Sequence, residues 1–335
     1  MEMPVDIFLT WVDGEDPNWI QERKRYAKLY PESCSEENGV ARYRNWDNLR
    51  YVFRGIEKYL PWVRKIYLIT CGQIPDFLDL NNPKVVIVNH KDYIPESYLP
   101  TFNSNTIEMN LFRIDDIADN ILLFNDDIFI VDYIQKEYFI KDEKPGDEAI
   151  ERIIGNIGIN HAHCMINNAW IINKYFNKKE IKRKYKDKWF SLKYGKDIFR
   201  NILMNYFTDF EGLRNPHEPF LLKKEIFKKL WELEPNMMDK GSRNKFRNVT
   251  DVTQYVVRYW NIFEGNFSPR KHIGKAWNIN DNNYMEIAGD IRNKKYPLFS
   301  LDEKNGEEII DFVAVKKVIN DALESVLPEK SKFEK

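Results

Sequence analysis

Four short apolar runs of strand length occur in the N-terminal part of the chain. They are rich in β-branched and aromatic side chains and cover residues 5–12, 65–70, 84–88 and 120–124. Helical patterns separate them, and in 47–59 the apolar positions recur every three or four residues. A further helix is expected after Asn103 or Ser104, where capping is favoured over the binding of a phosphate. This alternation predicts an α/β fold with a doubly wound, mainly parallel sheet and helices on both faces.

Polar residues follow these runs at points that should meet in space. Because ligands bind at the carboxyl ends of parallel strands, residues 10–16, 70–73 and 125–127 are expected along one edge of the sheet. The third of these begins with the triplet Asn-Asp-Asp, which interrupts an apolar run. Its oxygen atoms suit Mg²⁺ or Mn²⁺ bound together with the phosphates of a substrate. A simple turn is the alternative, since Asn and Asp readily bond their own backbone.

After the Asn-Asp-Asp triplet the pattern becomes irregular and then mostly helical. A helix is expected at 252–263, with Thr250 or Asp251 as its cap. An amphipathic helix at 307–327 closes the chain, and the tail 330–335 should be frayed.

Three features of this C-terminal part have both a functional and a structural interpretation. His161 and His163 could bind a metal, but no second ligand pair lies near them in the sequence, and a half-buried strand is the favoured interpretation. The basic segment 178–188 is by default a solvated helix face, and a surface for anionic lipid is the sharper alternative. Prolines on both sides of His217 suit a fixed side chain, although a loop ordered for packing would look the same.

Composition narrows the class of protein. The 335 residues allow one large domain or two closely packed ones. Lys and Arg number 51 and Asp and Glu 52, so the net charge of −1 argues against nucleic acid as a partner. Three scattered cysteines favour a reducing compartment, and no apolar stretch reaches the ~20 residues of a membrane span. With no signal-peptide pattern at the N-terminus, we expect a soluble, cytoplasmic protein.

Several stretches together resemble the Stealth family. The opening motif of that family usually reads I-D-x-V-Y-T-W-V-D-G-S-D. The similar stretches are 6–16, 48–75, 100–104, 107–108, 124–127 and 279–282, with shorter similarity around His217 and Arg247. The chain departs from the pattern at Glu15, where Ser is usual, and at Cys71, where Asp is usual. Both positions lie in expected loops, so they bear on donor preference more than on the family.

The resemblance implies a sugar-1-phosphate transferase. Stealth enzymes include bacterial capsule polymerases and the catalytic part of the animal N-acetylglucosamine-1-phosphotransferase. The chain would move a hexose-1-phosphate, first of all N-acetylhexosamine-1-phosphate, from a UDP-sugar to a saccharide hydroxyl. It would form a phosphodiester and release UMP in capsular or exopolysaccharide synthesis. The acceptor would be an oligosaccharide, a polysaccharide or a lipid-linked saccharide, with peripheral association at the inner face of a bacterial membrane through 178–188.

The resemblance also implies roles for individual residues. His217 would act as general base or, alternatively, as covalent nucleophile, and Arg247 would neutralise the transferring phosphoryl group, with Asp127 as the third catalytic residue. The expected ligands of Mg²⁺ or Mn²⁺ are Asp126, Asp127, Asp281 and Asn282. The expected substrate-binding residues are Thr10, Trp11, Val12, Asp13, Gly14, Asp16, Arg50, Arg54, Asn103 and Ser104.

Several of these residues also have a structural interpretation. Arg50 and Arg54 could form surface ion pairs on their helix, Trp11 could belong to the core, and Asp281 could form a turn. The metal assignment requires that the carboxylates of Asp127 and Asp281 lie within reach of one cation.

The expected architecture is Rossmann-like and GT-A-like, with a mostly helical C-terminal part that folds back on the active site. The expected parts are a nucleotide-sugar-binding part at 1–135, a helical and irregular part at 136–300 that carries His217, Arg247 and Asp281, and the closing helix and tail at 301–335. A metal-dependent nucleotide-sugar glycosyltransferase that releases UDP is the alternative enzyme. A catalytically silent carbohydrate- or partner-binding protein is the alternative from another class.

Overall fold

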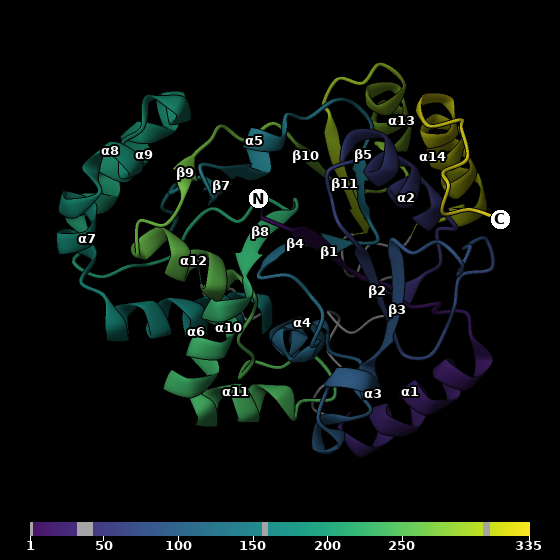
Figure 1. The fold of residues 1–335 in the computed structure, drawn as a ribbon, viewed down its shortest axis with the longest axis horizontal. Coiled ribbons are helices and arrows are strands. Elements are labelled where there is room, and N and C mark those ends of the chain that lie inside the picture. The colour runs from purple at the N-terminus through teal and green to yellow at the C-terminus, as the bar shows by residue number, and fades with distance from the viewer. Residues whose placement is uncertain (1–2, 32–42, 156–159, 304–308) are drawn as a thin grey trace.

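A five-stranded, mainly parallel sheet forms the centre of the molecule (Figure 1). The computed structural model describes residues 3–31, 43–155, 160–303 and 309–335. The strand order is β3-β2-β1-β4-β8, with β1 (Val5–Thr10), β2 (Ile66–Thr70), β3 (Val85–Asn89) and β4 (Asn120–Asn125) parallel and β8 (Phe220–Lys223) antiparallel to β4. The four strands expected from the sequence are therefore confirmed, and the α/β class with them.

Successive residues of the central strands enter two different cores, because side chains alternate between the faces of a sheet. Ile7 and Leu9 of β1 belong to one core and Phe8 to the other. The first core includes residues of α2 (Leu49–Tyr59) and α14 (Phe312–Val326), and the second includes residues of α4 (Ser104–Met109), α10 (Lys224–Leu233) and α12 (Tyr255–Phe263). Helices thus cover both faces of the sheet, as predicted.

The helix that follows the first strand begins at Pro17, directly after Asp16. Asp16 accepts hydrogen bonds from the backbone N–H groups of Asn18 and Trp19, and Pro17 occupies the first position of α1 (Pro17–Leu29). A carboxylate at this position satisfies amides that have no partner inside the helix. The start of α1 is therefore fixed by Asp16.

Two small sheets that the sequence analysis does not predict flank the central one. One has the order β10-β11-β5, with β10 (Lys275–Ile279), β11 (Leu298–Glu303) and β5 (Ile128–Ile130). The other has the order β6-β7-β9, with β6 (Ile140–Lys141), β7 (Lys144–Asp147) and β9 (Ser268–Pro269). Through these pairings the C-terminal part of the chain returns to the strands that follow β4.

Helices make up most of the rest of the C-terminal part, as expected. The remaining helices are α3 (His90–Tyr93), α5 (Lys136–Phe139), α6 (Asn160–Tyr175), α7 (Lys178–Lys184), α8 (Lys186–Trp189), α9 (Ile198–Leu203), α11 (Pro235–Ser242), α13 (Tyr284–Arg292) and the 3₁₀ turns η4 (Glu96–Tyr98), η5 (Leu111–Arg113), η6 (Leu192–Asp197) and η7 (Met204–Tyr206). In the part of the chain that is described, none of these helices has the length and apolar character needed to cross a membrane.

Two sequence-based assignments are wrong in this part. His161 and His163 lie on the helix α6 and not on a strand, and buried positions such as Ala162, Met165 and Ala169 follow the helical period. Two residues apart on a helix, the two imidazoles point to different sides. Asp251 does not cap α12, which begins at Tyr255 after Gln254.

The C-terminal tail packs against α2, so the prediction that residues 330–335 are frayed is wrong. Phe333 is 3% exposed, and its ring lies edge-on to Phe53 at a centroid distance of 5.8 Å. Arg54 donates to Glu334 at 2.8 and 3.1 Å and to Glu324 at 2.8 Å. Sequence position alone suggested a loose end, but an aromatic ring and a paired carboxylate hold it.

The Arg54 contacts predict a large effect on stability. Arg54→Ala would leave the carboxylate of Glu334, 2% exposed, without its cation, so the free energy of unfolding should fall by roughly 3 kcal/mol or more. Arg50→Ala is the matched control on the same helix, since Arg50 is half-buried and lies over the Phe77 ring at 5.6 Å. Urea denaturation of both variants checks this. Equal stabilities would contradict the structural role of Arg54.

Candidate active site

The loops at the carboxyl ends of β1 and β2 are held together by Gln73. Its side-chain amide donates to the carbonyl of Asp13 at 2.9 Å and to Asp16 Oδ2 at 3.3 Å, and its Oε1 accepts the Asp13 N–H at 2.8 Å. At the neighbouring strand end, Thr10 pairs with Asn125 across β1 and β4. The three polar segments predicted to share one edge of the sheet do share it.

The turn after β1 is built around a close approach at Gly14. A Cβ atom on Gly14 would lie 1.6 Å from the carbonyl oxygen of Tyr43, so no other residue fits there without a backbone shift. Trp11 is half-buried against the first core, and Val12 packs on a small cluster of Trp19 and the rings around it. The close approach to Tyr43 therefore requires glycine at this position of the turn.

Three ligand-type side chains from distant parts of the chain converge beside Asn125. They are Asp127 in the turn between β4 and β5, His217 in the loop before β8, and Asp302 on β11, and one ligand atom of each lies within 4.8 Å of the others. His217 Nε2 is 3.6 Å from Asp127 Oδ1. All three side chains are half-buried.

Backbone hydrogen bonds bring β11 into this group. The N–H of Leu301 donates to the carbonyl of Asp127 at 2.9 Å, and Phe299 pairs with Phe129 across the antiparallel strands β11 and β5. The Ser300 hydroxyl donates to the carbonyl of His217. Strand β11 therefore fixes both Asp127 and His217 through the backbone and adds Asp302 from its own side chain.

The carboxylates of this group repel one another. Burial, and then the charge of Asp127, raises the pKa of the Asp126 carboxyl to about 7, with a smaller contribution from Asp302. A carboxyl group whose pKa is raised by burial and by neighbouring carboxylates is typical of a site that takes up positive charge.

A buried ion pair holds the loop that carries His217. Arg258 is 1% exposed, bonds Asp147, and donates to the carbonyl of Arg214 at 2.9 Å and to Asn215 Oδ1 at 2.6 Å. A residue of this kind positions the loop without touching a substrate.

The residue next to His217, Glu218, is the centre of a second buried group. Its carboxylate accepts hydrogen bonds from Arg270 at 2.6 Å and Tyr138 at 2.9 Å, and it contacts His272 Nδ1 at 3.0 Å. Burial raises the pKa of Glu218, but Arg270 and the hydrogen bond with His272 outweigh it, so the pKa is lowered. The charged Glu218 thus anchors the base of the loop.

Arg247 belongs to another polar group, which lies beside α4. Its guanidinium donates to Ser104 Oγ at 2.8 Å. Burial raises the pKa of Glu108 to about 7, and the positive charge of Arg247 offsets part of that rise. Burial also raises the pKa of Tyr255, and the charges of both Glu108 and Asp127 act on its hydroxyl. The Tyr255 hydroxyl is therefore within electrostatic range of both Glu108 and Asp127.

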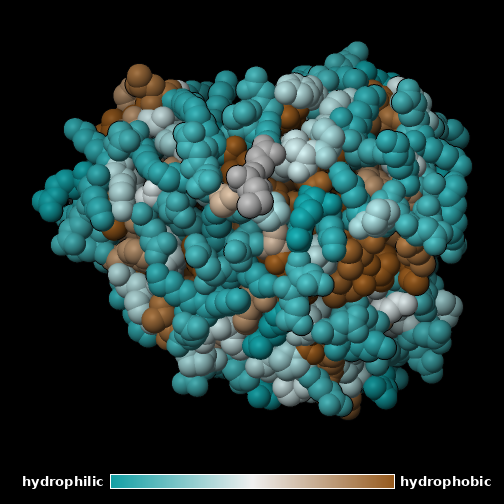
Figure 2. All heavy atoms as spheres, in the orientation of Figure 1, coloured by the Kyte–Doolittle hydropathy of each residue, from teal (hydrophilic) through white to brown (hydrophobic). Residues whose placement is uncertain are grey.

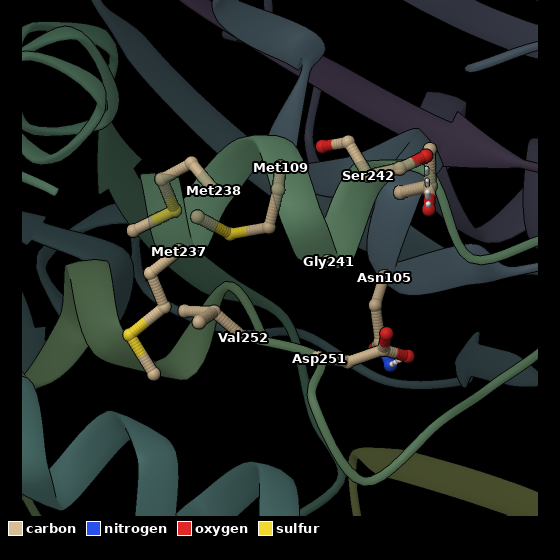
Figure 3. Close-up of a pocket in the computed structure, with 9 residues that line it drawn as sticks. Asn105, Met109, Met237, Met238, Gly241, Ser242, Asp251 and Val252 are labelled. Atoms are coloured by element: carbon tan, nitrogen blue, oxygen red, sulfur yellow. Dashed lines mark hydrogen bonds between the residues drawn. The ribbon is translucent and has the colours of Figure 1, made fainter. Parts of the chain in front are cut away.

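Asp251 holds the loop of Arg247 onto α4. Its Oδ2 accepts the side-chain amides of Asn103 at 2.8 Å and Asn105 at 2.9 Å, and Asn103 also caps α4. Figure 3 shows Asn105 and Asp251 pointing toward each other at one end of a small cavity, with three methionines at the other end. The cavity holds about 10 Å³, room for about one water molecule. The capping predicted for Asn103 is confirmed, and its amide is used within the protein.

Other expected site residues lie elsewhere. Asp281 Oδ2 accepts the backbone N–H of Ile310 at 3.0 Å, and Asn282 is exposed in the turn between β10 and α13. Neither belongs to the group of three around Asp127. Arg54 binds the C-terminal tail, and Arg50 lies on Phe77.

Sequence reasoning missed Asp302. The sequence did contain a signal. The mostly apolar run 298–301 ends on Asp302 and Glu303, an acidic strand end like that of β4. The positioning residues Arg258 and Arg270 carried no signal, since an isolated arginine in a helical or irregular pattern is ordinarily exposed.

Comparisons with known proteins give the class. The chain is 39% identical over 332 residues to the capsular polysaccharide phosphotransferase WcwK of Streptococcus pneumoniae, covering 99% of this chain and 98% of the relative. It is 33% identical to the exopolysaccharide phosphotransferase cps2G of Lactiplantibacillus plantarum (99% and 96% covered). It is 30% identical to the receptor polysaccharide phosphotransferase WefC of Streptococcus oralis (98% and 99% covered). The protein is accordingly a transferase of the phosphotransferase type.

The family follows from the same comparisons. Residues 3–30 match the model of Stealth protein conserved region 1, and residues 42–147 match that of conserved region 2. With relatives of 30–39% identity along nearly its whole length, the chain belongs to the Stealth family, and the resemblance seen in the sequence is confirmed.

Among solved structures, the galactosyltransferase LgtC in complex with donor and acceptor sugar analogues is similar at a TM-score of 0.36 and 10% identity, over 94% of this chain and 95% of that one. The α/β class follows from the order and direction of the central strands.

The buried Glu108 predicts a pH dependence of stability. With a pKa near 7 in the folded protein against an ordinary value of 4.5, the folded state binds more protons than the unfolded state between these values. Stability should therefore fall as the pH rises from about 4.5 to 7. Glu108→Gln removes this loss, so at pH 8 the variant should be more stable than the parent by roughly 2 to 3 kcal/mol and nearly equal to it at pH 4.5.

Urea denaturation at several pH values measures the effect. Glu225→Gln, at an exposed position of α10, is the control and should follow the parent at every pH. If the Glu108→Gln and parent curves run parallel, Glu108 is not the group that loses stability on ionisation.

Proposed function

We propose that the protein transfers a hexose-1-phosphate, with N-acetylhexosamine-1-phosphate as first candidate, from a UDP-sugar to a hydroxyl of a saccharide acceptor in capsular or exopolysaccharide synthesis. The acceptor oxygen forms a bond to the phosphorus that bears the sugar, and the bond from that phosphorus to the oxygen of UMP breaks. A phosphodiester and UMP result. The names of the relatives support the class of reaction, and the convergence of Asp127, His217 and Asp302 carries the proposal.

The donor set fits a divalent cation. Two carboxylates and one imidazole lie within 4.8 Å of one another at an edge of the sheet, and carboxylate oxygens are preferred ligands of Mg²⁺ and Mn²⁺. We propose Asp127 and Asp302 as the main ligands, with Asp126 beside them, and Asp302 takes the place that Asp281 and Asn282 have in the sequence-based hypothesis. When bound, the cation would offset the charge of the donor's diphosphate.

His217 is the proposed general base. Its Nε2 would accept the proton of the acceptor hydroxyl, and Asp127 Oδ1, 3.6 Å away, would stabilise the resulting imidazolium. The firm attachment of its loop by Ser300 and Arg258 supports this role, because a base must be held at a fixed distance from the hydroxyl. The covalent alternative, a phosphohistidine at the same atom, uses the same geometry.

Arg247 is the proposed partner of the transferring phosphoryl group. A guanidinium can donate two parallel hydrogen bonds to phosphate oxygens, and Ser104 orients it from one side. The turn at Trp11, Asp13 and Gly14 is the proposed wall of the uridine pocket, where the rigid approach of Gly14 to Tyr43 would preserve the shape.

Contact with a membrane surface through the basic segment 178–188 also belongs to this proposal. Only part of that segment is available for it, because Lys178 and Lys182 are buried beside Glu151. The exposed cations around it are therefore the relevant ones.

Released nucleotide distinguishes this function from the alternative. With a panel of UDP-sugars, Mg²⁺ or Mn²⁺ and saccharide acceptors, we expect UMP, measured by chromatography, whereas a glycosyltransferase would release UDP. His217→Ala should lower UMP release by 10²-fold or more. UDP as the product, or full activity of His217→Ala, would contradict the proposal.

A pair of matched variants tests the proposed ligand set. Asp302→Asn should lower the rate of UMP release by 10²-fold or more and raise the Mn²⁺ concentration needed for half-maximal rate, because it removes one of two carboxylate ligands. Asp281→Asn should change both quantities less than threefold. The reverse result would restore Asp281 as the ligand and exclude Asp302.

A further inference from the structure

Helix α9 (Ile198–Leu203) and the turn after it expose a row of large apolar side chains. Phe199 is 69% exposed, Leu203 73% and Tyr206 90%, with Ile202 at 50%. Their spacing of three and four residues places them on one face of the helix. Leu192, 89% exposed, precedes them in η6. A soluble surface seldom shows so many large apolar groups together unless they contact something.

The opposite face of α9 is fixed to the body of the protein. Asn201 is fully buried, and its amide donates to the carbonyls of Ala149 and Trp189, both at 2.6 Å, while its Oδ1 accepts the N–H of Glu151 at 2.8 Å. Met204 is buried as well. The apolar row is therefore held outward by specific contacts, and it cannot turn inward without breaking them.

Positive charge surrounds this apolar row. Residues 178–207 contain ten Lys and Arg against three Asp and Glu, a formal charge of +7 in a chain whose net charge is −1. In sequence, Lys193 follows Leu192, and Lys196 and Arg200 flank Phe199. The exposed cations are Lys179, Arg183, Lys184, Lys186, Lys193, Lys196 and Arg200.

The apolar row lies at the edge of the molecule. Figure 1 places α7, α8 and α9 in a layer at the far left, beyond the central sheet. In the same orientation Figure 2 shows an apolar patch at the upper left, near the end of this layer, with hydrophilic residues around it. A projecting patch of this shape suits a flat surface more than a groove-filling partner.

We propose that this face, formed by Leu192, Phe199, Ile202, Leu203 and Tyr206 with the cations around it, binds the surface of an anionic lipid bilayer. Apolar and aromatic side chains enter the boundary of head groups and acyl chains, and Lys and Arg beside them meet the anionic head groups. The complementary charge favours lipid over a second copy of this chain, because two such faces of like charge repel each other. The inference does not depend on the chemistry at Asp127.

Flotation with vesicles tests the inference. The full chain should bind vesicles of phosphatidylcholine with 30% phosphatidylglycerol, bind phosphatidylcholine alone at least tenfold more weakly, and lose affinity as salt is raised. Phe199→Ser/Leu203→Ser should weaken binding at least tenfold, and Lys196→Glu/Arg200→Glu should do the same on the anionic vesicles. UMP release with a soluble acceptor and the thermal unfolding temperature should stay at parent values in both.

A matched apolar control is available at the other end of the molecule. Ile310→Ser/Val313→Ser changes two residues that are 91% and 77% exposed beside α14, and it should bind vesicles like the parent. No binding of the parent to anionic vesicles would overturn the inference, as would equal loss in the control. Self-association that Phe199→Ser/Leu203→Ser abolishes, without vesicle binding, would make the face a protein interface and overturn it too.

Discussion

The pairing of β11 with β5 is the constraint on which the candidate active site depends. The backbone bond from Leu301 to the carbonyl of Asp127 joins a C-terminal strand to the turn that ends β4. It sets Asp302 beside Asp127, and the neighbouring Ser300 holds the backbone of His217. Since the bond from Leu301 to Asp127 joins two backbones, its geometry depends on strand register, and a one-residue slip would turn both Ser300 and Asp302 to the other face of the strand.

Buried charges make the second set of constraints. Arg258 with Asp147 and Arg270 with Glu218 lie on either side of the His217 loop, and each arginine is nearly inaccessible to solvent. Buried pairs of this kind add little net stability, but removing one partner is costly because the other charge stays buried. We interpret these ion pairs as positioning contacts. They keep the His217 loop, which has no regular secondary structure, at a fixed distance from β4 and β11.

The elements of the fold that depend on the local pattern of apolar and polar residues could be predicted from the sequence. The four parallel strands, the capped start of α1 and the edge shared by Thr10, Gln73 and Asn125 depend on apolar runs and on the residues that end them. Asp127 was singled out as part of a polar strand end and His217 by its flanking prolines, and the family resemblance supplied their roles; the structure brings them to 3.6 Å. The strands and the start of α1 could be predicted because each needs only a short stretch of the chain, whereas the catalytic roles of Asp127 and His217 stay predictions.

The failures share a physical reason, which is long-range pairing. Asp281 and Asp302 are both acidic residues near a strand end, and only the register of β11 against β5 shows which one faces Asp127. Arg54 looks like a surface residue of α2 until Glu334, 280 positions later, reaches it. His161 and His163 gave no clear period over so short a stretch, and helical packing decided their structure.

The charge distribution connects the site with the rest of the molecule. Three carboxylates crowd one edge of the sheet, and their repulsion, added to burial, keeps the pKa of Asp126 near 7. Residues 178–207, with a formal charge of +7, lie in a separate helical layer. The two regions have opposite sign: the first collects carboxylates at one edge of the sheet, and the second collects lysines and arginines around an apolar face. The net charge of −1 is therefore the sum of an acidic sheet edge and a basic helical layer. These two regions are recognised only from their positions in the fold.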